Sequence, residues 1–241
     1  MHSVPRPLGR LPRPGSVARA TVAGVDHPDT ASMRRPYLRE GLTEADLPAE
    51  PLYLFAAWFA EVVAEGLYEP NAMVLATVSP DGWPEARTVL LKGYDAHGLR
   101  FFTNTASAKG AALAASPRAA VVFPWHPIQR QVRVTGDVVR LGAGEVAHYF
   151  ATRPRDSQLG AWASPQSAVV ASRADLEERL AAAEREFPDG TEVPVPPQWG
   201  GFRVVPRSWE FWAGRPGRMH DRLRYRRTSS DDPWTVERLA P

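Results

Sequence analysis

The 241-residue chain contains no cysteine. This excludes disulfides, thiolate nucleophiles and cysteine-ligated zinc or iron–sulfur sites. Because a chain without cysteine suits a reducing compartment, we expect a cytoplasmic protein. Long apolar runs are also missing: stretches such as residues 119–123 fall far short of the roughly 18 residues of a membrane span, so we expect no membrane partner.

Lysine is almost absent as well. Lys92 and Lys109 are the only lysines among 29 basic residues. A compositional bias toward arginine explains this ratio, but it does not explain where the two remaining lysines stand. Both fall in segments with features of ligand binding, described below. A G-x-G-x-x-G motif is missing too, which argues against a Rossmann dinucleotide site.

The small positive charge has a local origin. The net charge is +2, and residues 1–30 alone hold four arginines against two aspartates, so the rest of the chain is neutral. Without a basic stripe or a binding motif, we expect no nucleic-acid partner. Residues 1–30 are rich in proline, arginine and glycine and lack apolar periodicity, which predicts a disordered tail. Residues 31–241 are predicted to form a single domain.

The remaining chain predicts strands with inserted helices. Apolar residues at helical spacing predict helices over 52–67, 106–115 (with Ser107 as a possible cap), 144–152 and 174–187. A hairpin of strands 72–79 and 85–93 is expected around Pro80-Asp81-Gly82. Further strands are predicted over 99–103, 118–125, 129–141, 201–205, 209–212, 222–227 and 234–239, with a loop at 193–197. Short strands in this number indicate a mainly β, α+β protein, built as a closed barrel decorated by helices.

Two segments of this pattern have features of a phosphate site. The strand 87–92 has a cation at each end, and residues 102–109 lead from a strand into a helix N-terminus that carries Lys109. Hydroxyls, free backbone N–H groups and a lysine at a helix start can cradle a phosphate. The alternative for each segment alone is an ordinary strand end and an ordinary helix cap.

Two later segments add arginines and aromatic rings. Residues 149–158 place Arg153 and Arg155 beside Asp156 and Ser157, a set that can clamp a phosphate or form a solvated loop with an Arg155–Asp156 pair. Residues 209–212 hold two tryptophans and are followed by Arg-Met-His-Asp-Arg at 218–222. The tryptophans suit contact with a planar ring or a place in the core, and His220 with Asp221 can be a simple surface pair.

In this order, the segments resemble the pyridoxamine 5′-phosphate oxidase family over residues 33–241. The resemblance rests on RRPY (34–37), DLPAEP (46–51), RTVLLKGYD (87–95), FPWH (123–126) with RQVRVTG (130–136), YFATRPRDSQLGAW (149–162), QWGGFRV (198–204), EFW (210–212), RMHDR (218–222) and RLAP (238–241). It implies a homodimeric FMN-binding split β-barrel with active sites shared between subunits.

The resemblance also implies the site residues. FMN binding is expected from Arg87, Thr88, Val89, Leu90, Leu91, Lys92, Phe102, Thr103, Lys109, Gln131, Gln166, Ser167, Trp212 and Arg222. Substrate binding is expected from Arg34, Arg35, Tyr37, Lys92, Tyr149, Arg153, Ser157, Arg218, Met219 and His220. Arg218 and His220 are the expected catalytic residues, and no metal is expected. Two phosphates need two cation clusters, which agrees with the reading of the segments themselves.

One position departs from the family pattern. Family members usually have an arginine directly before the lysine of the phosphate cradle, where this chain has Ala108. The loss of one charge-assisted contact is expected to weaken FMN binding by roughly 1.5–3 kcal/mol. Arg118 is a possible substitute. A smaller departure is Glu69, at a position that is often aspartate.

The activity that the resemblance implies is oxidation of pyridoxamine or pyridoxine 5′-phosphate to pyridoxal 5′-phosphate. A hydride leaves C4′ for FMN, O2 is reduced to hydrogen peroxide, and the amine substrate releases ammonia. Two alternatives remain open at this stage. One is a deazaflavin- or haem-dependent relative, which would not need the vitamer-binding residues, and the other is a non-catalytic flavin or pyridoxal-phosphate carrier, for which Ala108 is the hint.

Overall fold

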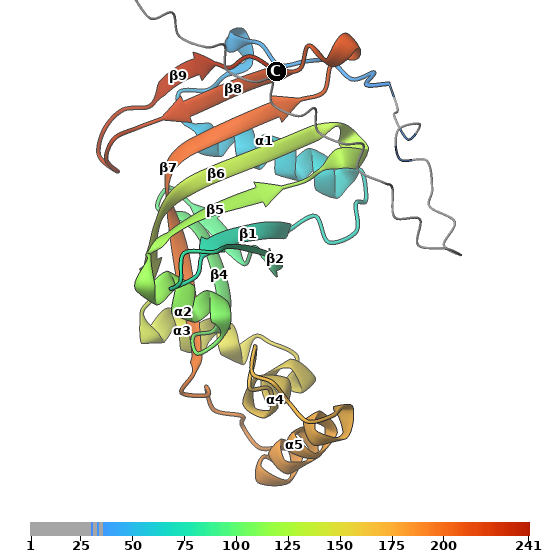
Figure 1. Ribbon diagram of the computed structural model, residues 1–241, viewed down its shortest axis with the longest axis vertical. Coiled ribbons are helices and arrows are strands. Elements are labelled where there is room, and N and C mark those ends of the chain that lie inside the picture. Colours follow the sequence, from blue (N-terminus) through green and yellow to red (C-terminus); the bar gives the residue numbers. More distant parts are fainter. Residues whose placement is uncertain (1–29, 31–32, 34–35) are drawn as a thin grey trace, which may run out of the picture. The chain divides into compact units, whose positions relative to one another are not determined.

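A long antiparallel sheet organises the chain in the computed structural model (Figure 1). The structure describes residues 30, 33 and 36–241. Residues 1–29 of the predicted tail 1–30, and the candidate residues Arg34 and Arg35, therefore lie outside the described residues. The chain separates into Met1–Pro36 and Tyr37–Pro241, and the following description concerns the second unit.

Nine strands form one sheet in which every neighbouring pair is antiparallel. Its central path runs β2-β1-β5-β6-β7-β4-β3, and β8 pairs with β7 and β9. The strands are β1 Ala72–Val78, β2 Pro84–Leu90, β3 Gly93–Asp95, β4 Gly98–Asn104, β5 Arg118–Phe123, β6 Arg130–Arg140, β7 Trp199–Ala213, β8 Asp221–Arg226 and β9 Thr235–Arg238. Within the described part of the chain no ladder joins β2 to β3, so the expected closed barrel is corrected to a curled sheet that stays split.

Over residues 37–241, five α-helices and three short 3-10 turns precede the strands or lie between them. The helices are α1 Pro51–Ala64, α2 Ala108–Ala115, α3 Ala143–Ala151, α4 Arg155–Ala163 and α5 Arg173–Glu186. The 3-10 turns are η2 Glu44–Asp46, η3 His126–Ile128 and η4 Pro216–Arg218. No helix in the described residues is long and apolar enough to cross a membrane.

The main core lies between α1 and the sheet. Phe55 on α1 is fully buried, and its ring centroid lies 5.1 Å from that of Phe123 and 5.3 Å from that of Trp209. Alternation along the strands supplies the other wall: Val132 and Val134 of β6 are buried, while Arg133 between them is exposed. A smaller cluster, made by Phe150, Leu159, Ala183 and Val193, joins α3, α4 and α5.

The long strand β7, which pairs with β6, β4 and β8, differs from one prediction. Residues 201–205 and 209–212 were expected as two strands, but they belong to one continuous strand. Pro206 lies between the two expected strands, and proline is disfavoured in the middle of a strand. The strand continues because Pro206 stands at a bulge, where the β6–β7 register shifts between Thr135 and Gly136. A Cβ at Gly136 would lie 2.0 Å from the Val205 carbonyl oxygen, so this close approach requires glycine.

The structure differs from the sequence-based expectations in two other places, the end of β2 and helix α4. The second hairpin strand was expected to reach Gly93, but β2 ends at Leu90. The Lys92 N–H instead donates to the Arg100 carbonyl at 2.8 Å, which turns the chain toward β4. Helix α4 was not predicted, because its first turn is polar and directly follows a proline.

Candidate active site

A cavity of about 480 Å³ lies where β2, β4, α2 and the α3–α4 junction meet. Its lining contains eleven of the residues expected to bind cofactor or substrate: Thr88, Val89, Leu90, Lys92, Phe102, Thr103, Lys109, Tyr149, Arg153, Ser157 and Gln166. Sequence segments that lie up to 78 residues apart therefore converge on one site. Thr152, Pro154 and Trp199 complete the lining and were not among the predicted residues.

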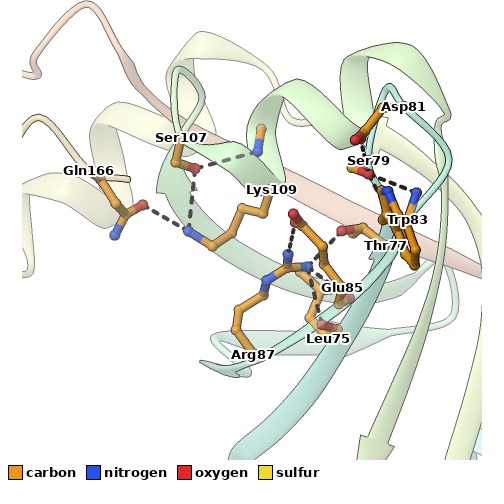
Figure 2. A network of polar contacts seen from close by, with 11 residues as sticks. Leu75, Thr77, Ser79, Asp81, Trp83, Glu85, Arg87, Ser107, Lys109 and Gln166 are labelled. Carbon is orange, nitrogen blue, oxygen red and sulfur yellow. Dashed lines mark hydrogen bonds and ion pairs between the residues drawn. The ribbon is translucent and has the colours of Figure 1, made fainter. Parts of the chain in front are cut away.

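The first of two cation clusters stands at the N-terminus of α2 (Figure 2). Lys109 is only 8% exposed, and its Nζ lies 2.9 Å from Gln166 Oε1 and 3.3 Å from Ser107 Oγ. Burial, and secondarily the charge of Arg87, lower the Lys109 pKa. In the described residues Lys109 forms no ion pair, so its charge is compensated by neutral dipoles alone.

Local sequence explains how α2 presents this lysine. The predicted cap is confirmed: the Ser107 side chain accepts from the Gly110 N–H. A Cβ at Gly110 would lie 2.1 Å from the Thr105 carbonyl oxygen, so the tight start of the helix depends on this glycine. Arg87, on the neighbouring strand β2, is held by Glu85 at 2.6 Å and by the Thr77 hydroxyl at 2.6 Å. The positive end of the helix dipole and these two cations favour an anion here.

The second cation cluster stands between α3 and α4. Arg153 lies in the short link before α4, and its guanidinium carbon is 4.1 Å from the centroid of the Trp199 ring. Its Nη1 is buried without a hydrogen-bond partner, and burial lowers the Arg153 pKa. Ser157 lines the cavity from the first turn of α4. An uncompensated guanidinium at a helix N-terminus is suited to a second anion.

The cavity lining also contains a pair of stacked aromatic rings. Phe102 of β4 and Tyr149 of α3 stack with ring centroids 3.9 Å apart and an interplanar angle of 15°. Lys92 is exposed, and its Nζ lies 6.0 Å from the centroid of the Tyr149 ring. The cavity lining thus combines aromatic rings with cationic side chains, both of which can contact a planar phosphorylated ring.

A second group of predicted residues gathers elsewhere, at the far end of β7. Tyr37, Trp212 and His220 form an aromatic cluster with ring centroids 4.7–5.6 Å apart. The His220 Nδ1 accepts the Arg215 N–H at 3.1 Å, which leaves Nε2 as the ring nitrogen that can carry the proton in the neutral form. Arg218 has a left-handed backbone, with φ 63°, and is exposed beside exposed Met219. Backbone strain of this kind is concentrated at functional sites.

Arg222 and Gln131 belong to the same region. Arg222 Nε donates to the buried carboxylate of Glu210 at 2.8 Å, and its Nη1 donates to the Ala240 carbonyl at 2.8 Å. Gln131 of β6 stands opposite Trp212 in the β6–β7 register. None of the residues of this second group lines the 480 Å³ cavity. Trp212 is eleven residues along β7 from Gly201, the partner of Phe102, a path of roughly 36 Å at the usual strand rise.

Arg155 and Asp221 have other contacts in the structure than the sequence predicted. Arg155 does not face the cavity: its guanidinium donates to the carbonyls of Phe187, Pro188 and Thr191, and its nearest carboxylate is Asp189 rather than Asp156. Asp221 pairs with Arg238 at 2.6 Å and not with His220.

The other predicted site residues lie in the core or outside the 480 Å³ cavity. Trp209 is a core residue at 2% exposure, and the Leu91 side chain is in the same core. Arg87 and Ser167 do not line the cavity, although Arg87 is close enough to lower the Lys109 pKa. Ala108 is exposed at the start of α2. Arg118 lies beyond the other end of that helix and lines a different cavity with Asp137, so it does not replace the missing arginine.

Comparison with known proteins assigns the chain to a family. A profile described as pyridoxamine 5′-phosphate oxidase matches residues 59–184, and one described as the pyridoxine 5′-phosphate oxidase C-terminal dimerisation region matches residues 199–241. The pyridoxine/pyridoxamine 5′-phosphate oxidase of Nocardioides sp. is 54% identical over 89% of this chain and 99% of its own. That of Thermobifida fusca is 55% identical over 90% of this chain and 100% of its own.

Solved structures agree with these matches. The crystal structure of PhzG from Burkholderia lata 383 in complex with tetrahydrophenazine-1-carboxylic acid has a TM-score of 0.76 and 30% identity, over 82% of this chain and 95% of that chain. A pyridoxamine 5′-phosphate oxidase-related, FMN binding protein from Nostoc punctiforme has a TM-score of 0.64 and 20% identity, over 81% of this chain and all of that one, which concerns the fold alone. The expected mainly β split-barrel fold is confirmed, and the chain belongs to the pyridoxamine 5′-phosphate oxidase family.

Proposed function

We propose that this chain oxidises pyridoxamine 5′-phosphate and pyridoxine 5′-phosphate to pyridoxal 5′-phosphate, with FMN as cofactor and O2 as electron acceptor. The observation that carries the proposal is the pair of cation clusters in one cavity, at Lys109 and at Arg153. Neither residue has an acidic partner within the described structure, and the stacked rings of Phe102 and Tyr149 line the same cavity. One cluster suits the phosphate of the cofactor, and the other suits the phosphate of the substrate.

The residues around Lys109 fit the cofactor phosphate. Lys109 is a buried ammonium held by the oxygens of Gln166 and Ser107, with Arg87 adding a second positive charge nearby. A phosphate would supply the negative charge that this surrounding lacks. Residues 88–90 with Phe102 and Thr103 would hold the remainder of FMN in the same cavity, and Gln131, Trp212 and Arg222 would complete its binding from the second group.

The residues around Arg153 fit the substrate phosphate. Arg153 and Ser157 offer a guanidinium and a hydroxyl at the start of α4, while Lys92 and Tyr149 lie across the cavity. Bidentate guanidinium contacts fix both the position and the orientation of a phosphate group. Anchoring the phosphate at one end would hold the pyridine ring, and thereby its C4′ atom, at a defined distance from the cofactor.

The chemistry divides between cofactor and protein. Bound FMN would supply the redox chemistry, a two-electron oxidation at C4′ with O2 as the final acceptor and hydrogen peroxide as the product. Pyridoxine 5′-phosphate then gives the aldehyde directly, and pyridoxamine 5′-phosphate consumes one water and releases ammonia. Arg218 and His220 would orient the substrate ring and stabilise charge near the reacting carbon, with the proton of neutral His220 on Nε2 as the Arg215 hydrogen bond dictates.

The separation of the two groups supports assembly from two copies. The residues of the second group do not line the cavity of their own chain, and the dimerisation-region match covers the β7–β9 segment that carries most of them. In a homodimer, the second group of one subunit would face the cavity of the other, since a two-fold interface presents each surface reciprocally. Each active site would then contain residues of both chains.

Assay of the purified protein tests this function. Hydrogen peroxide and pyridoxal 5′-phosphate are measured together after addition of FMN and either vitamer phosphate. Equal amounts of aldehyde and peroxide are expected, with one ammonia per aldehyde from the amine only. Binding of FMN without turnover of either vitamer would contradict the oxidase proposal and favour a flavin carrier.

A further inference from the structure

Arg153 differs from other half-buried arginines in the groups around its guanidinium. Arg227 also lies over a tryptophan ring, that of Trp234 at 4.2 Å, but it donates hydrogen bonds to the Pro206 and Ser230 carbonyls. Arg203 lies 3.2 Å from Asp95 and 3.3 Å from Glu145. Arg130 pairs with Glu61 and also lies over the Trp58 ring, at 4.4 Å. Arg153, in contrast, makes no side-chain hydrogen bond and no ion pair in the described part of the chain, and its closest charge-compensating group is the face of Trp199.

Trp199 is itself firmly held. It is the first residue of β7 and stands opposite Asn104 of β4 in the sheet register. Its backbone N–H donates to the Pro196 carbonyl at 2.9 Å, and its ring meets that of Phe150 edge-on at 5.8 Å. The ring that lies under the Arg153 guanidinium thus belongs to a residue of the sheet rather than of a loop, and its buried Nε1 has no hydrogen-bond partner in the described residues.

An aromatic face orients an arginine without neutralising it. A carboxylate partner would occupy the guanidinium N–H groups and cancel the positive charge, so a phosphate would have to displace it. The quadrupole of an indole ring attracts the cation over its face and leaves the N–H groups at the edge of the guanidinium plane available. This distinction matters only at a position where the arginine has to bind an anion.

We propose that Trp199 is the positioning residue for the substrate phosphate: by stacking on Arg153 it holds the guanidinium in the orientation that grips the phosphate, with the charge left free. The inference rests on the proposed function and adds a residue to it. Trp199 acts through Arg153, so its removal should weaken substrate binding and leave the oxidation step and the FMN site intact.

Steady-state kinetics on two substitutions test the proposal. Trp199→Leu removes the aromatic face and is expected to raise KM for pyridoxine 5′-phosphate about tenfold, with kcat within about twofold of the parent. Trp199→Phe keeps an aromatic face and should raise KM only about threefold. The matched control is Trp162→Leu: Trp162 belongs to the same helical cluster and packs on Phe187 at 5.1 Å, but it does not line the cavity. The KM of the Trp162→Leu variant for pyridoxine 5′-phosphate should equal that of the parent.

A double-mutant cycle separates positioning from general packing. In an Arg153→Ala background, Trp199→Leu should change KM less than about twofold, because the residue through which it acts is gone. Multiplicative effects of the two substitutions, or a Trp199→Leu enzyme with an unchanged KM, would overturn the proposal. Equilibrium dialysis of pyridoxal 5′-phosphate gives a second readout, in which Trp199→Leu should lose about tenfold in affinity while FMN affinity stays unchanged.

The dialysis also keeps this inference distinct from the proposed function. If the parent protein binds pyridoxal 5′-phosphate but does not turn over, the oxidase proposal fails and the role of Trp199 is still measured by binding. If the parent turns over and neither KM nor product affinity responds to Trp199→Leu, the role of Trp199 fails and the oxidase proposal stands.

Discussion

Glu210 and Arg222 form an ion pair on adjacent strands, with Glu210 Oε1 and Arg222 Nε 2.8 Å apart. Glu210 is only 4% exposed, and its other oxygen lies 3.5 Å from Arg133. Arg222 also donates a hydrogen bond to the Ala240 carbonyl, so it connects the C-terminal residues to β8. A buried carboxylate thus fixes the direction of an arginine that we expect to contact FMN.

Glu210→Gln should weaken both folding and cofactor binding. The substitution keeps the side-chain shape but removes the charge that holds Arg222, and breaking a buried pair costs up to about 3–5 kcal/mol. We expect the free energy of unfolding of the FMN-free protein to fall by about 1–3 kcal/mol in urea titrations, with weaker quenching of FMN fluorescence in titrations. Glu237→Gln is the control, because Glu237 pairs with Arg224 at a more exposed site. Equal effects of the two substitutions would contradict this role for Glu210.

Ala108→Arg should tighten FMN binding. Ala108 is exposed at the first position of α2, next to Lys109, so an arginine there fits without burial. One added charge-assisted contact is expected to increase FMN affinity by about tenfold or more. The control Ala115→Arg places the same charge at the other, exposed end of α2. If both variants bind FMN like the parent, the cofactor phosphate does not lie at this helix start.

The affinity for FMN should depend on the protonation of Lys109. Burial and Arg87 lower the Lys109 pKa, so its positive charge is lost at a lower pH than for an ordinary lysine. In the window between the folded and unfolded pKa, the unfolded state binds the extra proton, so this group makes folding more favourable as pH rises. Phosphate binding responds in the opposite direction and should weaken as pH rises through the lowered pKa.

Lys109→Arg provides the comparison for that pH dependence. Arginine remains charged throughout the range, so FMN titrations between about pH 7.5 and 10 should show a smaller loss of affinity than in the parent. Identical pH profiles of the two proteins would mean that Lys109 does not bind the cofactor phosphate.

Mixed dimers test whether the two groups of residues meet across subunits. Arg153→Ala and Arg218→Ala each remove one half of the expected site, and each variant alone should have little activity. Mixing and refolding the two chains should restore about a quarter of parental activity, since half of the dimers are mixed and each contains one intact site. No recovery in verified mixed dimers would show that both residues act within one chain.

The spacing of apolar residues predicted the helices and strands that bury one of their faces in the core. Strand β1 and helices α1 and α5 were found within a few residues, because alternation or helical spacing records which side chains face the core. Strand β7 was divided in two because the bulge that accommodates Pro206 depends on β6, which is distant in sequence. Helix α4 was missed because its first turn is polar and directly follows a proline, so it lacks the apolar spacing of a helix.

In the candidate site, too, residues with a local sequence signal could be predicted, whereas contacts that depend on the tertiary fold could not. Lys109 and Arg153 were identified because their neighbouring residues have local features of anion binding. Trp199 was not, since a tryptophan at a strand start gives no indication that an arginine will lie on its ring. The separation of His220 from Arg153 could not be read from spacing either, because it depends on the length of β7 in the folded sheet.

The most direct test of the central claim is peroxide release by the purified protein with FMN and pyridoxamine 5′-phosphate, followed together with pyridoxal 5′-phosphate absorbance. The account predicts one peroxide for each aldehyde, with both products reduced when Arg153 is replaced by alanine. No aldehyde at saturating FMN, from a protein shown to bind the flavin, would contradict it.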